Sequence, residues 1–370
     1  MSEVTELELG ITADLHVHLR EGAMMELITP TVKQGGFSIA YVMPNLVPPI
    51  TTIEKVTEYH NQLSKLSPTT KFLMSFYLSK ELTPELIEEA GSKRIVHGVK
   101  CYPAGVTTNS KYGVDPNDFS SFYPVFEAMQ KHGLILNIHG EKPAVKNTTQ
   151  TEEDDIHVLN AEPKFLPALR KLHQDFPKLK IALEHCTTSD AVALIRELNA
   201  NTKESDEVYV AGTITAHHLS LTIDNWAGNP INFCKPVAKL PKDKRALVEA
   251  ATSGERWFFF GSDSAPHPIE AKSTHVGVCA GVYTQSHALS YLAEVFDEQD
   301  QLDNLKKFVS SNGVAFYAQP DILSDVAKLE TQRVWLVKRD IEVPHVIGNS
   351  QLKVVPFKAG ETLKWAVEWR

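Results

Sequence analysis

The stretch of sequence that decides the fold runs from residue 134 to residue 185. It begins with LILNIH at residues 134–139 and ends with KIALEH at residues 180–185, two short apolar runs typical of buried strands. Between them, residues 164–175 carry apolar side chains at the three- and four-residue spacing of a helix. A strand, a helix and a second strand of this kind predict a βαβ unit, whose two strands lie parallel in one sheet.

The same alternation extends in both directions from this stretch. Short runs rich in β-branched and aromatic residues predict eight strands, at Ile11–His16, Ile39–Met43, Lys71–Tyr77, Ile95–Lys100, Leu134–His139, Lys180–His185, Val208–Thr215 and Trp257–Ser262. Helical periodicity occupies most of the intervals, at Ile53–Leu66, Pro84–Ala90, Tyr123–His132, Lys164–Asp175, Ser189–Asn199 and Lys242–Ala251. Eight such units predict an α/β fold, a (β/α)8 TIM-type barrel in which helices surround a closed parallel sheet.

The rest of the chain predicts a small C-terminal extension. Helices are expected at Thr284–Phe296 and Leu302–Ser311, and the apolar residues beyond them alternate as they do in short strands. No repeat, low-complexity segment or linker divides the sequence. We therefore expect one catalytic domain over residues 1–370, with the barrel at about 11–285 and the extension at about 286–370.

Composition excludes several classes of function. The net charge is -9 without any run of Lys or Arg, so neither nucleic acid nor an anionic membrane surface is an expected partner. No apolar run approaches the ~20 residues of a membrane span, and the N-terminal residues are acidic where a signal peptide is basic. We expect a cytoplasmic protein that acts on a small molecule. The scattered cysteines show no C-x-x-C spacing, so nitrogen and oxygen are the expected donors to any metal.

Candidate metal ligands stand at the ends of the predicted strands, where barrel enzymes build their sites. The first strand leads into His16 and His18, whose spacing of two points both imidazoles to one side. The fifth and sixth strands end in His139 and His185, and the eighth delivers Asp263 after four aromatic residues. Each residue alone has an ordinary structural interpretation, a hydrogen-bonded histidine or a helix cap. Their joint placement favours a metal site, because a carboxylate after so apolar a run needs a cation or another firm partner.

Lys100 ends the fourth predicted strand, between Val99 and Cys101. A solvated surface lysine is the ordinary interpretation, but these flanks favour an amine that faces the barrel mouth. There a lysine loses its proton more readily and becomes a neutral nucleophile. Such an amine can add carbon dioxide to form a carbamate, whose two oxygens can bridge two metal ions.

The order H-x-H, Lys, His, His, Asp resembles the amidohydrolase superfamily with a binuclear metal centre. Within it, the chain is similar over essentially its whole length to the shorter, bacterial and fungal type of dihydroorotase. The strings that carry this resemblance are DLHVHLREG (14–22), VMPNLVPPITT (42–52), KCYPAGVTTNS (100–110), HGE (139–141), EHCTT (184–188), GSDSAPH (261–267) and VPFKAGETLKW (355–365). The resemblance implies a hydrolase of pyrimidine (UMP) biosynthesis that reversibly cyclises N-carbamoyl-L-aspartate to L-dihydroorotate and water.

The resemblance also implies roles for the strand-end residues. The expected ligands are His16, His18 and Asp263 for one zinc ion, and His139 and His185 for the other. Carboxylated Lys100, an N6-carboxylysine, and a hydroxide are expected to bridge the two ions. Asp263 is the expected catalytic base and acid, because a carboxylate can take a proton from the attacking oxygen and pass it to the departing ring nitrogen.

Arg20 is the expected partner of the substrate's free carboxylate. It lies two residues after His18 and offers a planar fork for bidentate contact, although without the resemblance a salt bridge at the barrel rim would be an alternative. By resemblance, Asn45 and His267 share that carboxylate.

Backbone groups and a loop complete the expected substrate site. By resemblance, the backbone at Leu219 and Ala280 meets the ureido group. The segment Pro103–Gly113 is rich in small and polar residues, as a mobile loop would be. In the family this segment closes over the substrate, and Thr107 and Thr108 are the expected contacts at its tip.

Two other functions remain open on the sequence. A related cyclic amidohydrolase, such as a dihydropyrimidinase or hydantoinase, would share the metal ligands but would need no carboxylate pocket at Arg20. A non-catalytic relative that serves as a scaffold is the second alternative, and the complete ligand set speaks against it. The resemblance implies a homodimer. His217 and His218, after the seventh strand, receive no role.

Overall fold

The computed structural model describes residues 4–105, 107–110, 113–144, 155–273, 277–317, 322–329 and 331–370, and all structural statements concern these residues. The predicted barrel strands are all present, the third of them as two pieces. They are β2 (Ala13–Val17), β3 (Ile39–Val42), β4 (Lys71–Leu73), β5 (Ser75–Tyr77), β6 (Gly98–Cys101), β7 (Ile135–His139), β8 (Ile181–Glu184), β9 (Val210–Ile214) and β10 (Phe258–Phe260).

The barrel strands are parallel, and their array closes on itself. Hydrogen bonds join them in the orders β2-β3-β4 and β5-β6-β7-β8-β9-β10. Only Met74 separates β4 from β5 along the chain. At the other seam the backbone N–H of Asp263 donates to the carbonyl of His16 at 2.8 Å, and Val17 forms a parallel bridge with Ser264. The predicted TIM-type barrel is therefore confirmed.

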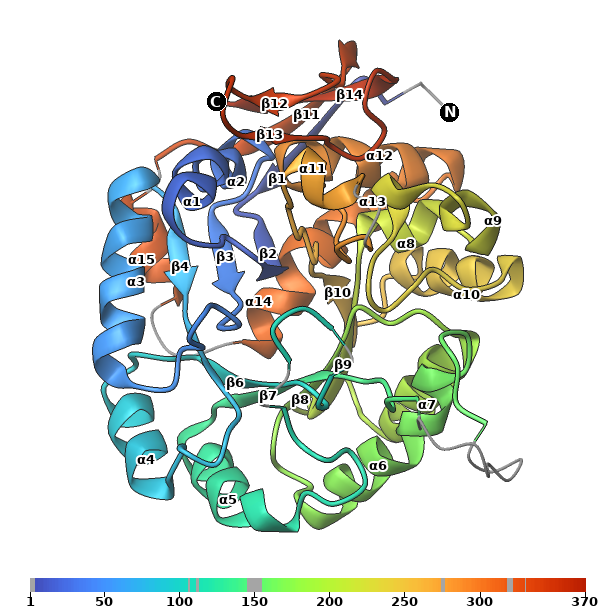
Figure 1. The fold of residues 1–370 in the computed structure, drawn as a ribbon. Helices are drawn as coiled ribbons and strands as arrows, with labels where there is room; N and C mark the ends of the chain where they lie inside the picture. The colour runs from blue at the N-terminus through green and yellow to red at the C-terminus, as the bar shows by residue number, and fades with distance from the viewer. Residues whose placement is uncertain are drawn as a thin grey trace.

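Helices surround the barrel (Figure 1). Those predicted between strands are present as α3 (Ile53–Leu66), α4 (Pro84–Ser92), α5 (Tyr123–His132), α6 (Ala161–Asp175), α7 (Ser189–Asn199) and α10 (Pro241–Thr252). Short helices that were not predicted are α1 (Gly22–Ile28), α2 (Pro30–Gln34), α8 (Ala216–Ser220), α9 (Ile223–Trp226) and α11 (Ile269–Lys272). Within the described ranges, no helix combines the length and the apolar character needed to cross a membrane.

The helix positions follow from local chemistry. The side chains of Thr52, Thr83 and Thr188 each accept a hydrogen bond from a backbone N–H three residues on, and these caps start α3, α4 and α7. Each helix then buries an apolar stripe against the barrel. In α3 that stripe includes Val56 and Leu63, both fully buried.

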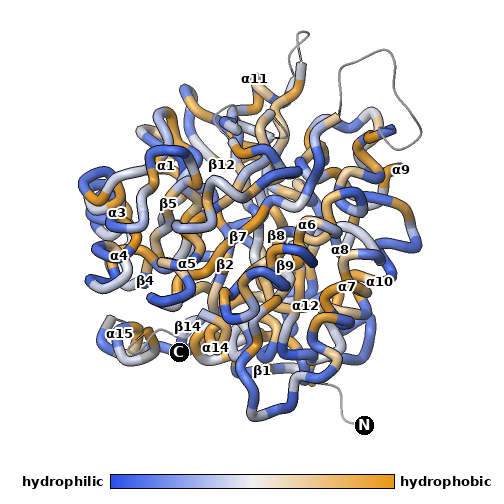
Figure 2. Tube along the Cα trace, turned by 90° about the horizontal axis from the view of Figure 1, so that it is seen from below, coloured by the Kyte–Doolittle hydropathy of each residue, from blue (hydrophilic) through white to orange (hydrophobic). Residues whose placement is uncertain are grey.

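The barrel interior is closed at its amino end by apolar side chains. Figure 2 shows strands β7, β8 and β9 at the centre of the molecule with helices around them. Their inward-facing residues form one buried cluster with the end of α14 (Asn312–Phe316), a cluster that includes Leu15, Tyr41, Ile135, Ala182, Phe259, Phe316 and Tyr317. Because this plug fills the barrel, polar side chains can gather only at the carboxyl ends of the strands.

The C-terminal extension contains helices and a small antiparallel sheet. Its elements are α12 (Ala288–Glu298), α13 (Leu302–Lys306), α14, α15 (Ile322–Leu329), β11 (Val334–Glu342), β12 (Ile347–Gly348), β13 (Lys353–Val354) and β14 (Thr362–Trp369). The predicted helix Leu302–Ser311 continues beyond α13 as a π-helical turn at Lys307–Ser311. The expected tail strands are confirmed. β1 (Glu6–Gly10), which was not predicted, joins them in the order β1-β11-β14, and Figure 1 shows this sheet outside the barrel with the C-terminus beside it.

Candidate metal centre

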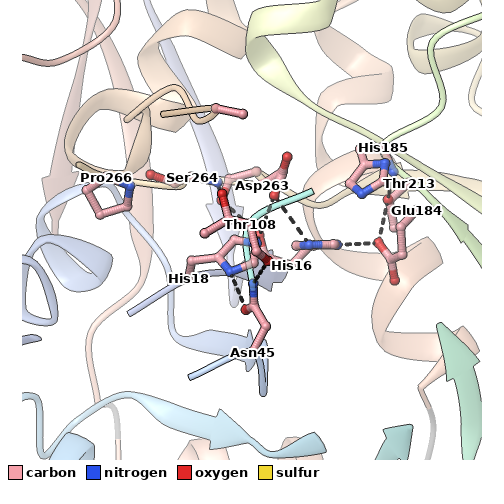
Figure 3. Close-up of polar contacts among 12 residues, drawn as sticks. His16, His18, Asn45, Thr108, Glu184, His185, Thr213, Asp263, Ser264 and Pro266 are labelled. Carbon is pink, nitrogen blue, oxygen red and sulfur yellow. Dashed lines mark hydrogen bonds and ion pairs between the residues drawn. The ribbon is translucent and has the colours of Figure 1, made fainter. Parts of the chain in front are cut away.

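The side chains predicted as metal ligands meet at the carboxyl end of the barrel, and Figure 3 shows part of this group. His16 and His18 come from the end of β2, and Asp263 from the turn after β10. The remaining members are Lys100 in β6, His139 at the end of β7 and His185 directly after β8. All are buried. Buried imidazole and carboxylate groups gathered this closely need hydrogen-bond partners or an opposite charge, so the cluster calls for a cation.

A register shift in β2 directs its histidines into the site. The pairing of β2 with β3 is irregular between Asp14 and Val17. Leu15 therefore belongs to the inner cluster, whereas Val17 packs outside the barrel. Irregularities of this kind re-aim side chains next to active sites. Here the shift directs the imidazoles of His16 and His18 toward the barrel mouth.

Glycine at position 261 permits the close approach of β10 to β2. A Cβ atom there would lie 2.9 Å from the Cβ of His16, closer than side chains tolerate. Asp263 and His185 adopt positive φ angles of 44° and 41°. Non-glycine residues seldom take this conformation, and it is concentrated at functional sites. The backbone is thus shaped to present these two side chains.

The first group of candidate ligands consists of His16, His18 and Asp263. One ligand atom from each lies within 4.8 Å of the others. Asp263 Oδ1 is 3.0 Å from His18 Nε2 and 3.4 Å from His16 Nε2. On the other side of His16, the ring centroid of His185 is 5.1 Å away, and that of His139 is 4.7 Å from His185. The four imidazoles therefore form one continuous row, from His18 through His16 and His185 to His139.

Lys100 has an unpaired amine in this site. Its side chain is 0% exposed, and Nζ has no hydrogen-bond partner among the described residues. Burial lowers the pKa of Lys100 to about 8, although the carboxylates of Glu184 and Asp263 act against that shift. The positive charge of Lys100 in turn lowers the pKa values of His139 and His185, after the larger effect of their burial. A buried amine without a hydrogen-bond partner loses its proton more readily, and the neutral amine can then react to form a carbamate.

A carboxylate orients His16. Its Nδ1 lies 2.7 Å from Glu184 Oε2, so Nε2 is the nitrogen left for a metal (Figure 3). Glu184 is fully buried and accepts further hydrogen bonds from Asn137 Nδ2 at 2.6 Å and Thr213 Oγ1 at 2.7 Å. Histidines that bind metals usually donate their other N–H to such an acceptor, which fixes the tautomer and the ring orientation.

The same pattern repeats at two more histidines. His139 Nε2 lies 2.8 Å from Glu141 Oε2, which leaves Nδ1 available. His18 Nδ1 lies 2.9 Å from Asn45 Oδ1, which leaves Nε2 available. Sequence reasoning missed both Glu141 and Glu184. Glu184 directly precedes His185, and Glu141 stands two residues after His139. An acidic residue this close to a predicted metal ligand could have indicated a carboxylate that orients a histidine.

The electrostatics of the cluster favour the ligand forms of these groups. Burial lowers the pKa of His18 to about 4, so this imidazole is neutral near pH 7. Burial alone would raise the pKa of Asp263, but the neighbouring imidazoles of His18 and His16 hold it below its ordinary value. A neutral imidazole beside an ionised carboxylate is the state that binds a divalent cation.

Arg20 and His267 lie together beside the metal ligands. Arg20 Nε donates to the carbonyl of Pro266 at 3.1 Å, and its Nη2 is 3.3 Å from His267 Nε2. His267 Nε2 also lies 3.0 Å from the carbonyl of Ala280. Asn45, held by His18, completes a group of donors at the barrel mouth. These predicted substrate contacts are therefore brought together.

A cavity opens onto these side chains. It is lined by His16, His18, Arg20, Asn45, Tyr102, Thr107, Thr108, His139, His185, Lys235, Asp263, Ala265, Ala280 and Gly281. Leu219 is not among the lining residues, and its side chain lies in the hydrophobic core, so its expected backbone contact stays a prediction. Lys235, which sequence reasoning missed, also lines the cavity. No motif in the sequence marked Lys235 as a candidate contact.

The predicted lid is seated on the cavity. Thr107 and Thr108 line it, and the carbonyl of Thr108 accepts a hydrogen bond from Asn45 Nδ2 at 3.3 Å. Asn109 Nδ2 donates in return to the carbonyl of Asn45 at 2.9 Å. Of the predicted segment Pro103–Gly113, residues 106, 111 and 112 lie outside the described residues.

The fold and the ligand cluster define the class of this protein. Histidines, a lysine and an aspartate at the carboxyl ends of a (β/α)8 barrel are the arrangement of the amidohydrolases, a class of metal-dependent hydrolases. A family model described as "Amidohydrolase" matches residues 69–210.

Comparison over the full chain narrows the class to one family. The dihydroorotase of Saccharomyces cerevisiae is 59% identical over 367 residues, which cover 99% of each chain. A probable dihydroorotase of Schizosaccharomyces pombe is 50% identical and covers 98% of this chain and 99% of its own. The solved structure of the S. cerevisiae enzyme in complex with 5-fluoroorotic acid superposes with a TM-score of 0.95 over 99% of both chains. This chain belongs to the dihydroorotase family and is a hydrolase.

Proposed function

We propose that this enzyme interconverts N-carbamoyl-L-aspartate and L-dihydroorotate at a binuclear zinc centre. The observation that carries the proposal is the buried, unpaired amine of Lys100 within a cluster that also contains the imidazoles of His16, His18, His139 and His185 and the carboxylate of Asp263. Neither a structural lysine nor a single metal ion explains that arrangement. Relatives named dihydroorotase over 99% of the chain disfavour the dihydropyrimidinase or hydantoinase alternative.

The residues present fit two zinc ions. His16, His18 and Asp263 would hold one, His139 and His185 the other, and a carbamate on Lys100 would bridge them. The amine nitrogen of Lys100 adds to the carbon of carbon dioxide and releases a proton, so the product is an anion with two ligand oxygens. When bound, the zinc ions polarise the scissile carbonyl and lower the pKa of the attacking water.

Asp263 would carry the proton. Its carboxylate is held ionised by His18, and the backbone at this position fixes its direction. During hydrolysis the carboxylate accepts a proton from the attacking water and gives it to the departing ring nitrogen. During synthesis the same proton moves the opposite way, from the amide nitrogen to the oxygen that leaves as water.

Arg20, Asn45 and His267 would bind the carboxylate that does not react. The guanidinium of Arg20 is fixed by the carbonyl of Pro266, so its donors are already oriented toward the cavity. We propose that backbone groups at Leu219 and Ala280 meet the ureido group; Ala280 lines the cavity, and Lys235, which also lines it, is a further candidate contact.

The wider setting follows the sequence expectations. We propose that residues 1–370 act as one catalytic domain, with the barrel at about 11–285 and the extension at about 286–370, and that the enzyme is a cytoplasmic homodimer. The N-terminal strand β1 supports the single domain, because it pairs with β11 of the extension before the chain enters the barrel.

Turnover of two cyclic substrates tests the proposed function. The purified enzyme should hydrolyse L-dihydroorotate and leave dihydrouracil, which lacks the ring carboxylate, almost untouched. Arg20→Met should raise KM for L-dihydroorotate by about 10- to 150-fold, the loss of a hydrogen bond to a charged group worth about 1.5–3 kcal/mol. It should leave the weak dihydrouracil rate unchanged. A wild-type preference for dihydrouracil would contradict the proposal.

Removal of the two lid hydroxyls should lower turnover without loss of metal. We expect the double variant Thr107→Ala, Thr108→Ala to reduce kcat by about 10-fold or more, because lid closure excludes water and adds hydrogen bonds to the substrate. Metal content per chain should equal that of the wild type. Ser121→Ala, an exposed position outside the cavity, serves as the control. Unchanged kinetics in the double variant would show that this segment is only a surface connection.

A further inference from the structure

A second cluster of metal-binding side chains lies outside the centre described above. His217 and His218 belong to α8, and Cys234 lies in the segment between Pro230–Asn232 and α10. All three are buried, and one nitrogen or sulfur atom from each lies within 4.8 Å of the others. The mechanism proposed for the barrel mouth uses none of them.

The spacing of the donor atoms suits one tetrahedral ion. His218 Nε2 is 3.6 Å from Cys234 Sγ, and these atoms lie 3.0 Å and 3.2 Å from the carbonyl oxygen of Pro236. Zinc bonds of about 2.0–2.3 Å at tetrahedral angles separate neighbouring ligand atoms by roughly 3.3–3.7 Å. The separation of His218 Nε2 and Cys234 Sγ therefore fits a shared ion, and the nitrogen of His217, within 4.8 Å of both, would move closer to complete the site.

A hydrogen bond orients His218 toward that position. Its Nδ1 lies 2.9 Å from Thr215 Oγ1, which also accepts from the backbone N–H of His218. Without a metal, Nε2–H donates to the carbonyl of Pro236 at 3.0 Å and Nδ1 accepts from the hydroxyl. In the other tautomer the hydroxyl accepts from Nδ1–H, and Nε2 becomes the ligand nitrogen. This is the arrangement of metal-bound histidines, whose second nitrogen is held by an acceptor.

His217 is the observation that points to a missing ligand. It is 0% exposed, and neither ring nitrogen has a hydrogen-bond partner within the part of the chain that the structure describes. Its ring centroid is 4.4 Å from that of His218. A buried imidazole with both nitrogens unpaired is costly, and an ion or a water molecule is what such a group ordinarily contacts.

We propose that His217, His218 and Cys234 bind a third zinc ion, separate from the binuclear centre. Two imidazoles and a thiolate form a donor set that zinc prefers, whereas magnesium and calcium require oxygen ligands. Burial raises the pKa of the Cys234 thiol to about 12, although the charges of Lys239 and Lys272 act against that shift, so a bound zinc ion would have to displace the thiol proton. The sequence expectation of nitrogen and oxygen donors alone would then apply only to the barrel mouth.

The ion would fix one wall of the substrate cavity. Lys235 lines that cavity and follows Cys234 directly in the chain. A bond from Cys234 to α8 would anchor this wall to the end of β9. Lys272 Nζ already ties the same segment to the opposite wall, since it donates to the carbonyls of Phe233 and Gly281, both at 2.8 Å. The proposed role of the ion is therefore structural: it would hold in place the segment at Cys234 and Lys235 that forms one wall of the substrate cavity.

Cobalt substitution tests this site independently of activity. The metal-free protein is reloaded with Co²⁺, and its near-ultraviolet spectrum is recorded. The proposed ligands of the binuclear centre include no sulfur, so a thiolate-to-cobalt charge-transfer band reports Cys234 alone. We expect the wild type to show the band. Cys234→Ser should lose it together with one metal ion per chain, and Cys279→Ser, at an exposed cysteine, should keep both.

His217→Gln provides a second measurement if Cys234→Ser does not fold. This variant should weaken cobalt binding at the third site by about 10-fold or more and shift the charge-transfer band, while circular dichroism stays unchanged. Absence of the band in the fully loaded wild type would overturn the proposal and assign the space to water. Persistence of the band in Cys234→Ser, or a band unaltered in His217→Gln, would overturn it as well.

Discussion

Asp263→Asn should lower turnover in both directions by ~10²- to 10⁴-fold or more, the usual contribution of a positioned acid or base. The reason is that a neutral amide cannot accept a proton from water or return it to the ring nitrogen. Asparagine has nearly the same shape and keeps an oxygen where Asp263 Oδ1 lies 3.0 Å from His18. Much of the metal should therefore remain, and the loss should appear in kcat.

Metal analysis beside kinetics separates the two effects. Asp243→Asn is a suitable control, because this buried carboxylate caps α7 through Ser189 and lies away from the metal centre. It should change stability but not kcat. If Asp263→Asn ran within a factor of about 10 of the wild type, Asp263 would not be the proton carrier. If it lost all metal, the kinetic effect would say nothing about proton transfer, and the Co²⁺ spectrum would show which ions were gone.

The strand-end residues of the site could be predicted from the sequence. A strand that alternates toward a buried barrel and ends in histidine or aspartate fixes the place of its last side chain, since parallel strands finish at one edge. His16, His139, His185 and Asp263 meet for this reason. The barrel and most of its helices follow from the same local periodicity.

Other features depend on contacts between distant segments. β1 is too short to be distinguished from a loop until β11, at the far end of the chain, pairs with it. Glu184 sits within an apolar strand, and only the folded barrel brings it to His16. Whether Leu219 or Lys235 faces the substrate depends on how the chain turns after β9, where no periodicity applies. The pairing of Cys234 with His218 was hidden for the same reason.

Lys100→Ala should remove the bridge of the metal centre and abolish activity. Lys100 is the residue proposed to bind both ions, so its loss leaves each group of imidazoles without a shared ligand. Their buried nitrogens would then bind zinc separately and more weakly. We expect at least one zinc ion to be lost from each chain and kcat to fall below detection. The barrel itself should persist, because Ala fits the space of a side chain whose amine has no hydrogen-bond partner among the described residues.

Two comparisons make this result specific to a carbamate. Lys180→Ala removes another barrel lysine, at the amino end of β8, where Nζ donates to the carbonyl of Phe316 at 3.0 Å, and it should retain metal and activity. Added acetate or propionate should restore part of the zinc and of kcat to Lys100→Ala, because a free carboxylate can occupy the space of the missing carbamate and offer the same two oxygens. The same acids should not rescue Asp263→Asn, since its bridge is intact. An alanine variant that holds its zinc and turns over at the wild-type rate would contradict the bridging role of Lys100, whatever the acids do.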